Sequence, residues 1–140
     1  MITLTEMAVA VLNTPDGREK TALSHAHAKT WFDSVAAGDP LPIGNATPPD
    51  DPARPPHPEL LSPTKMPKRK SGSQKGRIAL LHAIAHIELN AVDLHWDIIA
   101  RFAHIKMPHG YFDDWVKAAD EEIKHFNLLC NRLEAMGSYY

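Results

Sequence analysis

Residues 77–105, RIALLHAIAHIELNAVDLHWDIIARFAHI, decide the fold, because their apolar side chains recur at the spacing of a helix face. A second such stretch, YFDDWVKAADEEIKHFNLLCNRLEAMG, follows at residues 111–137, after a break at Pro108 and Gly110. No segment alternates apolar and polar residues over a useful length, so strands are not expected. The sequence therefore predicts an all-α protein built on one long antiparallel helix pair in residues 76–140.

Residues 1–38 are predicted to form an N-terminal helical segment. Glu6 follows Thr3 by three residues, which is the signature of a capping box and predicts a short helix over residues 4–12. Thr14 and Pro15 predict the start of a second helix, and Gly38 predicts its end. The apolar face expected for this second helix comprises Leu23, Ala26 or His27, Thr30 or Trp31, and Ser34 or Val35.

Residues 39–75 form a proline-rich, basic segment, since ten of the 12 prolines lie between positions 40 and 67. Proline removes a backbone donor and disfavours helix in the residue before it, so we expect an extended arm. Leu60, Leu61 and Met66 predict that this arm packs in part on the folded body. Basic residues run from Lys65 to Arg77 without interleaved aromatic residues, and we interpret them as a solvated loop rather than a nucleic-acid contact.

Composition excludes several classes of protein. The 140 residues carry a formal net charge of -2, which argues against a strongly basic nucleic-acid binder. No apolar run is long enough to span a bilayer, and no basic segment precedes the short apolar stretch at the N-terminus, as a signal peptide requires. Cys130 is the single cysteine, so an intramolecular disulfide is not expected. We therefore expect a cytoplasmic protein with no membrane partner.

Two glutamates fall where the helix pattern calls for apolar side chains. Glu88 lies at the centre of the apolar stripe of the first long helix, and Glu122 lies in line with the apolar face of the second. His125 follows Glu122 by three residues and projects from an adjacent position on that face. Because a buried, unpaired carboxylate costs several kcal/mol, a cation held between the helices would explain both acids.

Glu88, Glu122 and His125 are therefore predicted to be metal ligands. Carboxylate oxygens and a neutral imidazole suit iron or manganese. Ferritin-like bundles build each half of a dinuclear site from one Glu and one Glu-x-x-His. The alternative is a salt-bridge network on a solvated face. The basic residues that could form it are Lys124, Arg132 and Arg101.

Three further histidines lie on the first long helix. His82 and His86 are four residues apart, a spacing that can chelate zinc in a second site. The alternative is a polar face that hydrogen-bonds the proline-rich arm or water. His95 shares the stripe of Glu88 and is predicted to be a satisfied core histidine rather than a ligand.

Residues 53–77, 76–97 and 111–140 together resemble an uncharacterised ferritin-like family, described as domain of unknown function, family four-five-five. The sequences that carry the resemblance are ARPPHPELLSPTKMPKRKSGSQKGR, GRIALLHAIAHIELNAVDLHWD and YFDDWVKAADEEIKHFNLLCNRLEAMGSYY. The resemblance covers essentially the whole chain. It implies a ferritin-like helix bundle and a dinuclear metal site, whose ligands here map onto Glu88, Glu122 and His125.

Members of that family are longer, so the resemblance also implies that this chain is the N-terminal half only. The half-site would then be completed by a second copy in a homodimer or by a missing C-terminal half. We expect a protein that contributes half of a dinuclear iron or manganese site to an oxygen-dependent oxidoreductase acting on an unidentified substrate. The alternative is a non-catalytic helical interaction module or an inactive fragment. An RNA-modifying enzyme guided by the basic arm is a third hypothesis.

Overall fold

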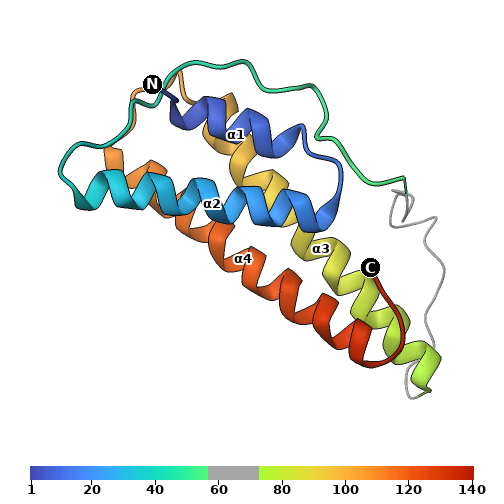
Figure 1. The fold of residues 1–140 in the computed structure, drawn as a ribbon. Coiled ribbons are helices and arrows are strands. Elements are labelled where there is room, and N and C mark those ends of the chain that lie inside the picture. The colour runs from blue at the N-terminus through green and yellow to red at the C-terminus, as the bar shows by residue number, and fades with distance from the viewer. Residues whose placement is uncertain (57–72) are drawn as a thin grey trace.

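The computed structural model describes residues 1–56 and 73–140, in which four helices follow one another along the chain. They are α1 (Leu4–Leu12), α2 (Gly17–Ala36), α3 (Gln74–Arg101) and α4 (His109–Ala135). No strand occurs in these ranges, so the prediction of an all-α protein is confirmed for them. The two long helices, α3 and α4, run antiparallel, and their far ends extend past α1 and α2 (Figure 1).

Local sequence signals set the helix ends. Thr3 Oγ1 accepts a hydrogen bond from the Glu6 N–H at 3.2 Å, and Glu6 Oε2 accepts one from the Thr3 N–H at 3.4 Å. The predicted capping box is therefore confirmed. At the other end of the chain, Gly137 has a φ of +79° and terminates α4. The Ser138 N–H bonds to the carbonyl of Leu133 at 2.9 Å, as in a Schellman motif.

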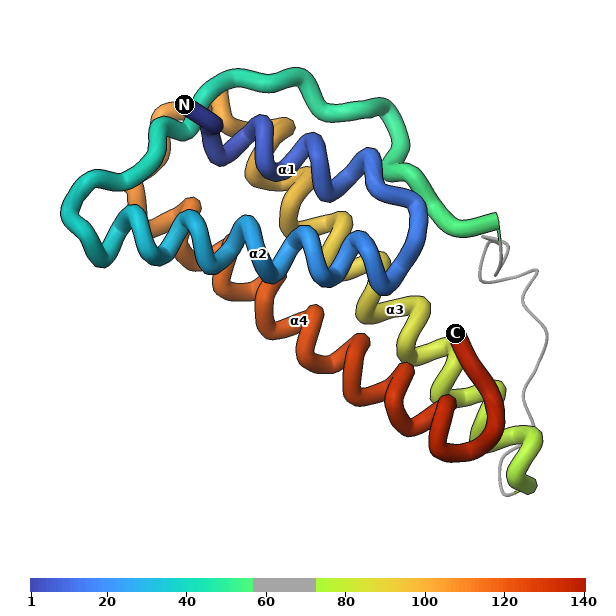
Figure 2. Tube along the Cα trace, viewed as in Figure 1, coloured from blue at the N-terminus to red at the C-terminus, as the bar shows by residue number. Residues whose placement is uncertain are grey.

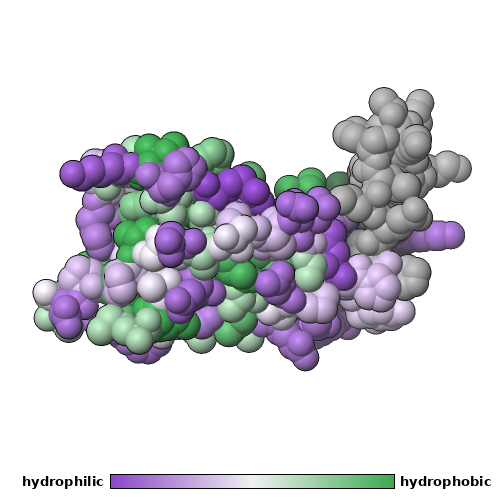
Figure 3. All heavy atoms as spheres, turned by 90° about the horizontal axis from the view of Figure 1, so that it is seen from above, coloured by the Kyte–Doolittle hydropathy of each residue, from purple (hydrophilic) through white to green (hydrophobic). Residues whose placement is uncertain are grey.

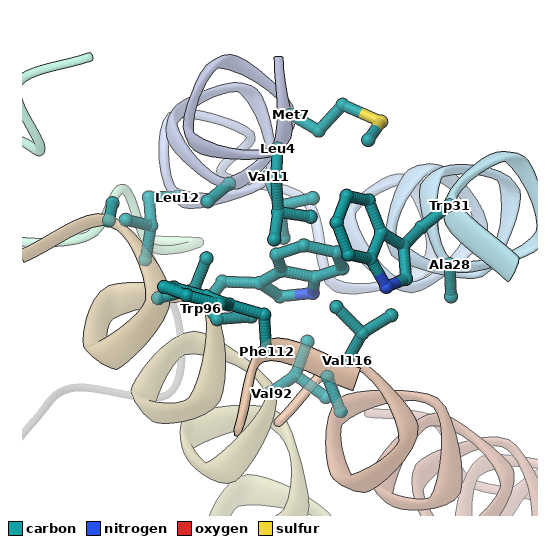
Figure 4. Packing of buried hydrophobic residues seen from close by; sticks show 14 of the residues in the cluster. Leu4, Met7, Val11, Leu12, Ala28, Trp31, Val92, Trp96, Phe112 and Val116 are labelled. Atoms are coloured by element: carbon teal, nitrogen blue, oxygen red, sulfur yellow. The ribbon is translucent and has the colours of Figure 1, made fainter. Parts of the chain in front are cut away.

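One hydrophobic core joins all four helices. Its centre holds Trp31 from α2 and Trp96 from α3, whose side chains project into the space between the helices (Figure 4). Both indole N–H groups are satisfied, because Trp31 donates to Asp113 Oδ1 at 2.8 Å and Trp96 donates to Ser24 Oγ at 2.6 Å. The N-terminal helical segment and the long helix pair therefore fold around the same core.

The apolar face predicted for α2 is incomplete. Trp31 is buried, and Leu23 and His27 are half-buried, as predicted, but the buried Lys20 and Ser24 were not included in that face. Ser24 accepts the hydrogen bond from the core tryptophan of α3, and Lys20 donates to Asp93, also on α3. Polar side chains are tolerated in a core when they have partners there, and those partners lie on another helix. The pattern of one helix therefore could not reveal them.

Residues 39–56 of the proline-rich segment have no regular secondary structure and run along α1 (Figure 2). The carbonyls of Pro42 and Ile43 accept hydrogen bonds from the N–H groups of Leu4 and Thr5, both at 2.9 Å. These two donors belong to the first turn of α1 and have no acceptor within that helix. The prediction of an arm packed on the folded body is confirmed for these residues.

Two predicted features of the arm lie outside the described residues. They are the apolar anchors Leu60, Leu61 and Met66, and the basic run over residues 65–70. After this gap, Ser73 caps α3, which begins one residue later and so overlaps the predicted end of the arm at residue 75.

Replacing Gly44 with alanine is expected to destabilise the fold by at least about 2 kcal/mol. Gly44 has a φ of +78°, and an added Cβ would lie 2.3 Å from Thr3 Oγ1, against the cap of α1. Gly38 has a similar φ of +76° but meets nothing within 4 Å, so Gly38→Ala is the matched control. That variant carries the conformational cost alone, about 1 kcal/mol. Equal losses in urea unfolding would contradict the close packing of the arm on α1.

The surface seen from above mixes hydrophilic and hydrophobic residues in small groups (Figure 3). Within residues 1–56 and 73–140, no helix combines the length and the apolar character needed to cross a bilayer.

Candidate metal centre

Glu88 on α3 converges with Glu122 and His125 on α4 in the groove between these helices. One ligand atom from each residue lies within 4.8 Å of the other two. His125 Nδ1 is 3.4 Å from Glu122 Oε2 and 3.5 Å from Glu88 Oε2. No other group of three histidine, cysteine or carboxylate side chains lies this close in the part of the chain that the structure describes. The structure thus brings all three predicted ligands together.

Helix geometry explains why these side chains meet. Glu122 and His125 are three residues apart on α4, so their side chains project from the same face. Glu88 lies thirteen residues before the end of α3 at Arg101, and Glu122 lies thirteen residues after the start of α4 at His109. Because the helices are antiparallel and joined by a short turn, equal distances from the turn place the two carboxylates level with each other.

The pKa values of the two carboxylates shift in opposite directions. Their side chains are largely buried, with 19% exposed for Glu88 and 24% for Glu122, whereas 55% of His125 is exposed. Burial raises the pKa of Glu88, and the hydrogen bond to Glu122 raises it further. The same hydrogen bond lowers the pKa of Glu122, and the neighbouring His125 lowers it too. A cation that binds both carboxylates would therefore compete with protons, most strongly at Glu88.

The predicted alternative, a salt-bridge network, is not seen in residues 1–56 and 73–140. There the glutamates of the cluster pair with His125 and not with a lysine or an arginine. Arg101 binds Asp97 instead, with a closest approach of 2.8 Å. Lys124 and Arg132 form no ion pair with either glutamate among these residues. The negative charge of the cluster is thus not balanced by a permanent cation of the described chain.

His95 lies on the same side of α3 as Glu88, but its hydrogen bonding differs from the prediction. Its Nδ1 is buried and is the one such side-chain nitrogen or oxygen without a hydrogen-bond partner among the described residues. The ring packs on Trp115 with the centroids 5.3 Å apart. Burial lowers the pKa of the imidazole, against the opposing charge of Glu122. The prediction of a satisfied core histidine is therefore wrong, because an aromatic ring takes the place of an acceptor.

Replacing His95 with phenylalanine is expected to raise the free energy of unfolding of the metal-free chain by about 1 kcal/mol. The change removes an unsatisfied buried nitrogen and keeps an aromatic ring against Trp115. His104→Phe, at an exposed position, is the control and should give no gain. Urea unfolding in the presence of a chelator measures both. A loss of stability for His95→Phe would show that Nδ1 has a partner.

His82 and His86 do not join a group of three candidate ligands in the described residues. The His82 ring stacks on Tyr140, with centroids 4.9 Å apart, and the His86 ring meets the same tyrosine edge-on at 6.4 Å. Further along this polar face, Arg54 of the arm donates a hydrogen bond to Asn90. The alternative prediction, contact between this face and the arm, is therefore confirmed at Asn90.

A buried ion pair between Lys20 on α2 and Asp93 on α3 was not predicted from the sequence. Both side chains are buried, and Lys20 Nζ also donates to the carbonyl of Ala53 in the arm at 2.9 Å. Burial lowers the pKa of Lys20 and raises that of Asp93, and each charge opposes the shift of the other. The sequence feature that could have indicated this pair is Asp93, an acidic residue on the buried side of α3. The same kind of feature led to the prediction for Glu88. This pair ties three segments together.

A groove of about 560 Å³ lies between the arm and α3, away from the three candidate ligands. Its two arginines are engaged within the chain, since Arg101 contacts Asp97 and Arg54 donates to Asn90. Arginine side chains that are already paired within the chain are less available to bind a ligand. We therefore assign the candidate site to the carboxylate–imidazole cluster, where the charges are not balanced in this way.

Fold and cluster together define an all-helical protein with three candidate metal-ligating side chains on one helix pair. The chain belongs to the family described as "Protein of unknown function (DUF455)", which it matches over residues 13–140. It is also similar to an uncharacterized protein of Haemophilus influenzae (strain ATCC 51907 / DSM 11121 / KW20 / Rd), with 40% identity over 93 residues. The match covers 63% of this chain and 32% of the relative, so the chain spans about a third of that protein.

No solved structure matches the chain. Family membership therefore confirms the resemblance, while the ferritin-like assignment is not tested by these comparisons. They also give no support to the placement of the chain as an N-terminal half.

Proposed function

We propose that this chain binds iron or manganese through Glu88, Glu122 and His125. The observation that supports the proposal is a pair of largely buried carboxylates on facing helices. They have no lysine or arginine partner in the described residues. A divalent cation would balance both negative charges. Two carboxylate oxygens and one imidazole nitrogen form a donor set that suits iron and manganese.

We further propose that the cluster is half of a dinuclear site in a ferritin-like bundle. Such bundles take a Glu from each of two helices and a Glu-x-x-His from each of the other two. Here α3 supplies the single glutamate and α4 supplies Glu122 and His125 three residues apart. The pair thus matches one half of that donor set in both residue type and placement.

The class of reaction that fits such a site is oxidation of a substrate by dioxygen or a peroxide, for which the bound metal would supply the redox chemistry. The chain itself would hold the metal and balance its charge with Glu88 and Glu122. The half-exposed His125 lies where solvent or a substrate can reach the cluster. The half-buried rings of His95 and Trp115 pack on each other and would limit the access of water from one side.

Metal content tests the proposal directly. The protein would be purified without chelator, analysed for its elements, and then titrated with manganese(II), or with iron(II) under anaerobic conditions. We expect about one iron or manganese ion per chain, since a complete site of two halves holds two. Protein that stays well below one ion per chain after loading would contradict the proposal and favour the non-catalytic interaction module.

A further inference from the structure

The face of the α3–α4 pair that carries the three candidate ligands is not covered by the rest of the described chain. Val92, Trp96 and Ile99 of α3 pack into the core formed with α1 and α2. Glu88 lies at the edge of that core. Ile98 is one residue from Ile99 and so points about 100° away from the core direction.

Apolar side chains surround the ligands on this uncovered face. They occur at helical spacing from Glu88 and Glu122 and are half-buried rather than buried. The five that flank the cluster are Ile84, Ile98, Trp115, Ala118 and Leu129. At its edge on α3, Ile87 and Leu94 are exposed. We call this surface the ligand face. A contiguous apolar surface around polar groups of matching geometry is typical of a protein interface.

We propose that a second copy of this chain packs on the ligand face and that divalent metal ions drive this association. The inference rests on the proposed metal function and names the partner that completes the site. A two-fold axis through the cluster would bring a second Glu88, Glu122 and His125 against the first set, because a two-fold interface uses the same patch on both subunits. The combined set has the composition of a complete dinuclear carboxylate site.

Charge balance explains why the metal would control the association. Each copy brings two carboxylates to the interface, so a dimer without metal would place four of them together. Burying like charges side by side is strongly unfavourable. Two divalent cations carry a total charge that equals that of the four carboxylates. The metal-free chain is therefore expected to be a monomer, and the metal-loaded chain a dimer with one ion per chain.

Sedimentation velocity on the full chain, in EDTA and in manganese(II) chloride, tests the partner separately from the metal. We expect the dimerisation constant to rise at least about tenfold with manganese. Bound manganese would be measured on the same samples. By linkage, dimerisation must raise the affinity for manganese by the same factor.

Two variants place a charge on the ligand face without touching a ligand. Ile98→Arg lies on the face, and Leu94→Arg lies at its edge, where the exposed side chain makes unfolding less of a concern. Ile2→Arg is the matched control, because Ile2 is exposed and precedes α1, outside the α3–α4 pair. Both face variants should weaken dimerisation in manganese, and the control should not. Circular dichroism would verify that all three remain helical.

The outcomes separate the two proposals. Manganese bound by a chain that stays monomeric would overturn the second copy as partner and leave the metal site standing. A chain that binds no manganese would overturn the metal site and this inference with it. A dimer that forms equally well in EDTA, or that resists both face variants, would overturn metal-driven packing on the ligand face.

Discussion

Replacing Lys20 with methionine is expected to lower the free energy of unfolding by about 3–5 kcal/mol. Lys20 and Asp93 are both buried, so removing the ammonium group leaves an unpaired carboxylate inside the fold. The carbonyl of Ala53 would lose its donor in the same step. Urea unfolding followed by circular dichroism measures the loss, and we also expect the arm to be cleaved faster by proteases near residue 53.

Lys29→Met is the matched control for this prediction. Lys29 pairs with Asp33 on the same helix, but both side chains are mostly exposed, so the loss should stay below about 0.5 kcal/mol. The double variant Lys20→Met with Asp93→Leu should recover most of the stability lost by Lys20→Met alone, because no charge remains buried. If Lys20→Met and Lys29→Met cost the same, the buried pair does not hold α2, α3 and the arm together.

Replacing Glu122 with glutamine is expected to weaken manganese binding by at least about 100-fold. The loss of a residue that only hydrogen-bonds a metal ligand typically weakens binding less than this, and Glu122 is proposed to bind the metal itself. Glutamine keeps the size of the side chain but removes the charge that would balance the cation. The amide group can still donate a hydrogen bond to Glu88, so the metal-free fold should remain intact. Equilibrium dialysis against manganese(II) measures the affinity.

Glu121→Gln provides the control one residue away. Glu121 is exposed and points about 100° away from Glu122 on the helix, so its loss should change manganese affinity by less than about threefold. Both variants remove one negative charge from the same turn of α4. Equal effects on affinity would mean that manganese responds to the overall charge of the helix and not to ligation at the cluster.

The features of the fold that depend on neighbouring residues were predictable from the sequence. The capping box at Thr3 and Glu6 is confirmed because it involves residues within a few positions of each other. The long helix pair was predictable for a related reason. Two apolar stripes separated by Pro108 and Gly110 leave few arrangements other than an antiparallel hairpin.

Features that depend on distant segments were not predictable in the same way. The buried face of α2 is set by Asp93 and Trp96 on α3, more than 70 residues further along the chain. Without those partners Lys20 and Ser24 have the sequence character of surface residues. The contacts of the arm with the first turn of α1 were not predictable either. They are long-range, and they join backbone groups that every residue carries, so no residue type in the sequence indicates them.

The candidate site was predictable because its signal is a violation of a periodic pattern. Glu88 and Glu122 interrupt apolar stripes, and the helix spacing of Glu122 and His125 fixes their shared direction. The position of His95 was predicted correctly, but its unsatisfied Nδ1 was not. Whether a core histidine finds a partner depends on the side chains that other helices bring to it, and here that neighbour is Trp115.

The measurement that tests the central claim most directly is a crystal structure of the chain grown with manganese(II), with an anomalous difference map at the manganese edge. The account predicts a peak bonded to the carboxylate oxygens of Glu88 and Glu122 and to a ring nitrogen of His125. A fully occupied manganese peak elsewhere, for example at His82 and His86, with Glu88 and Glu122 still hydrogen-bonded to each other, would contradict it.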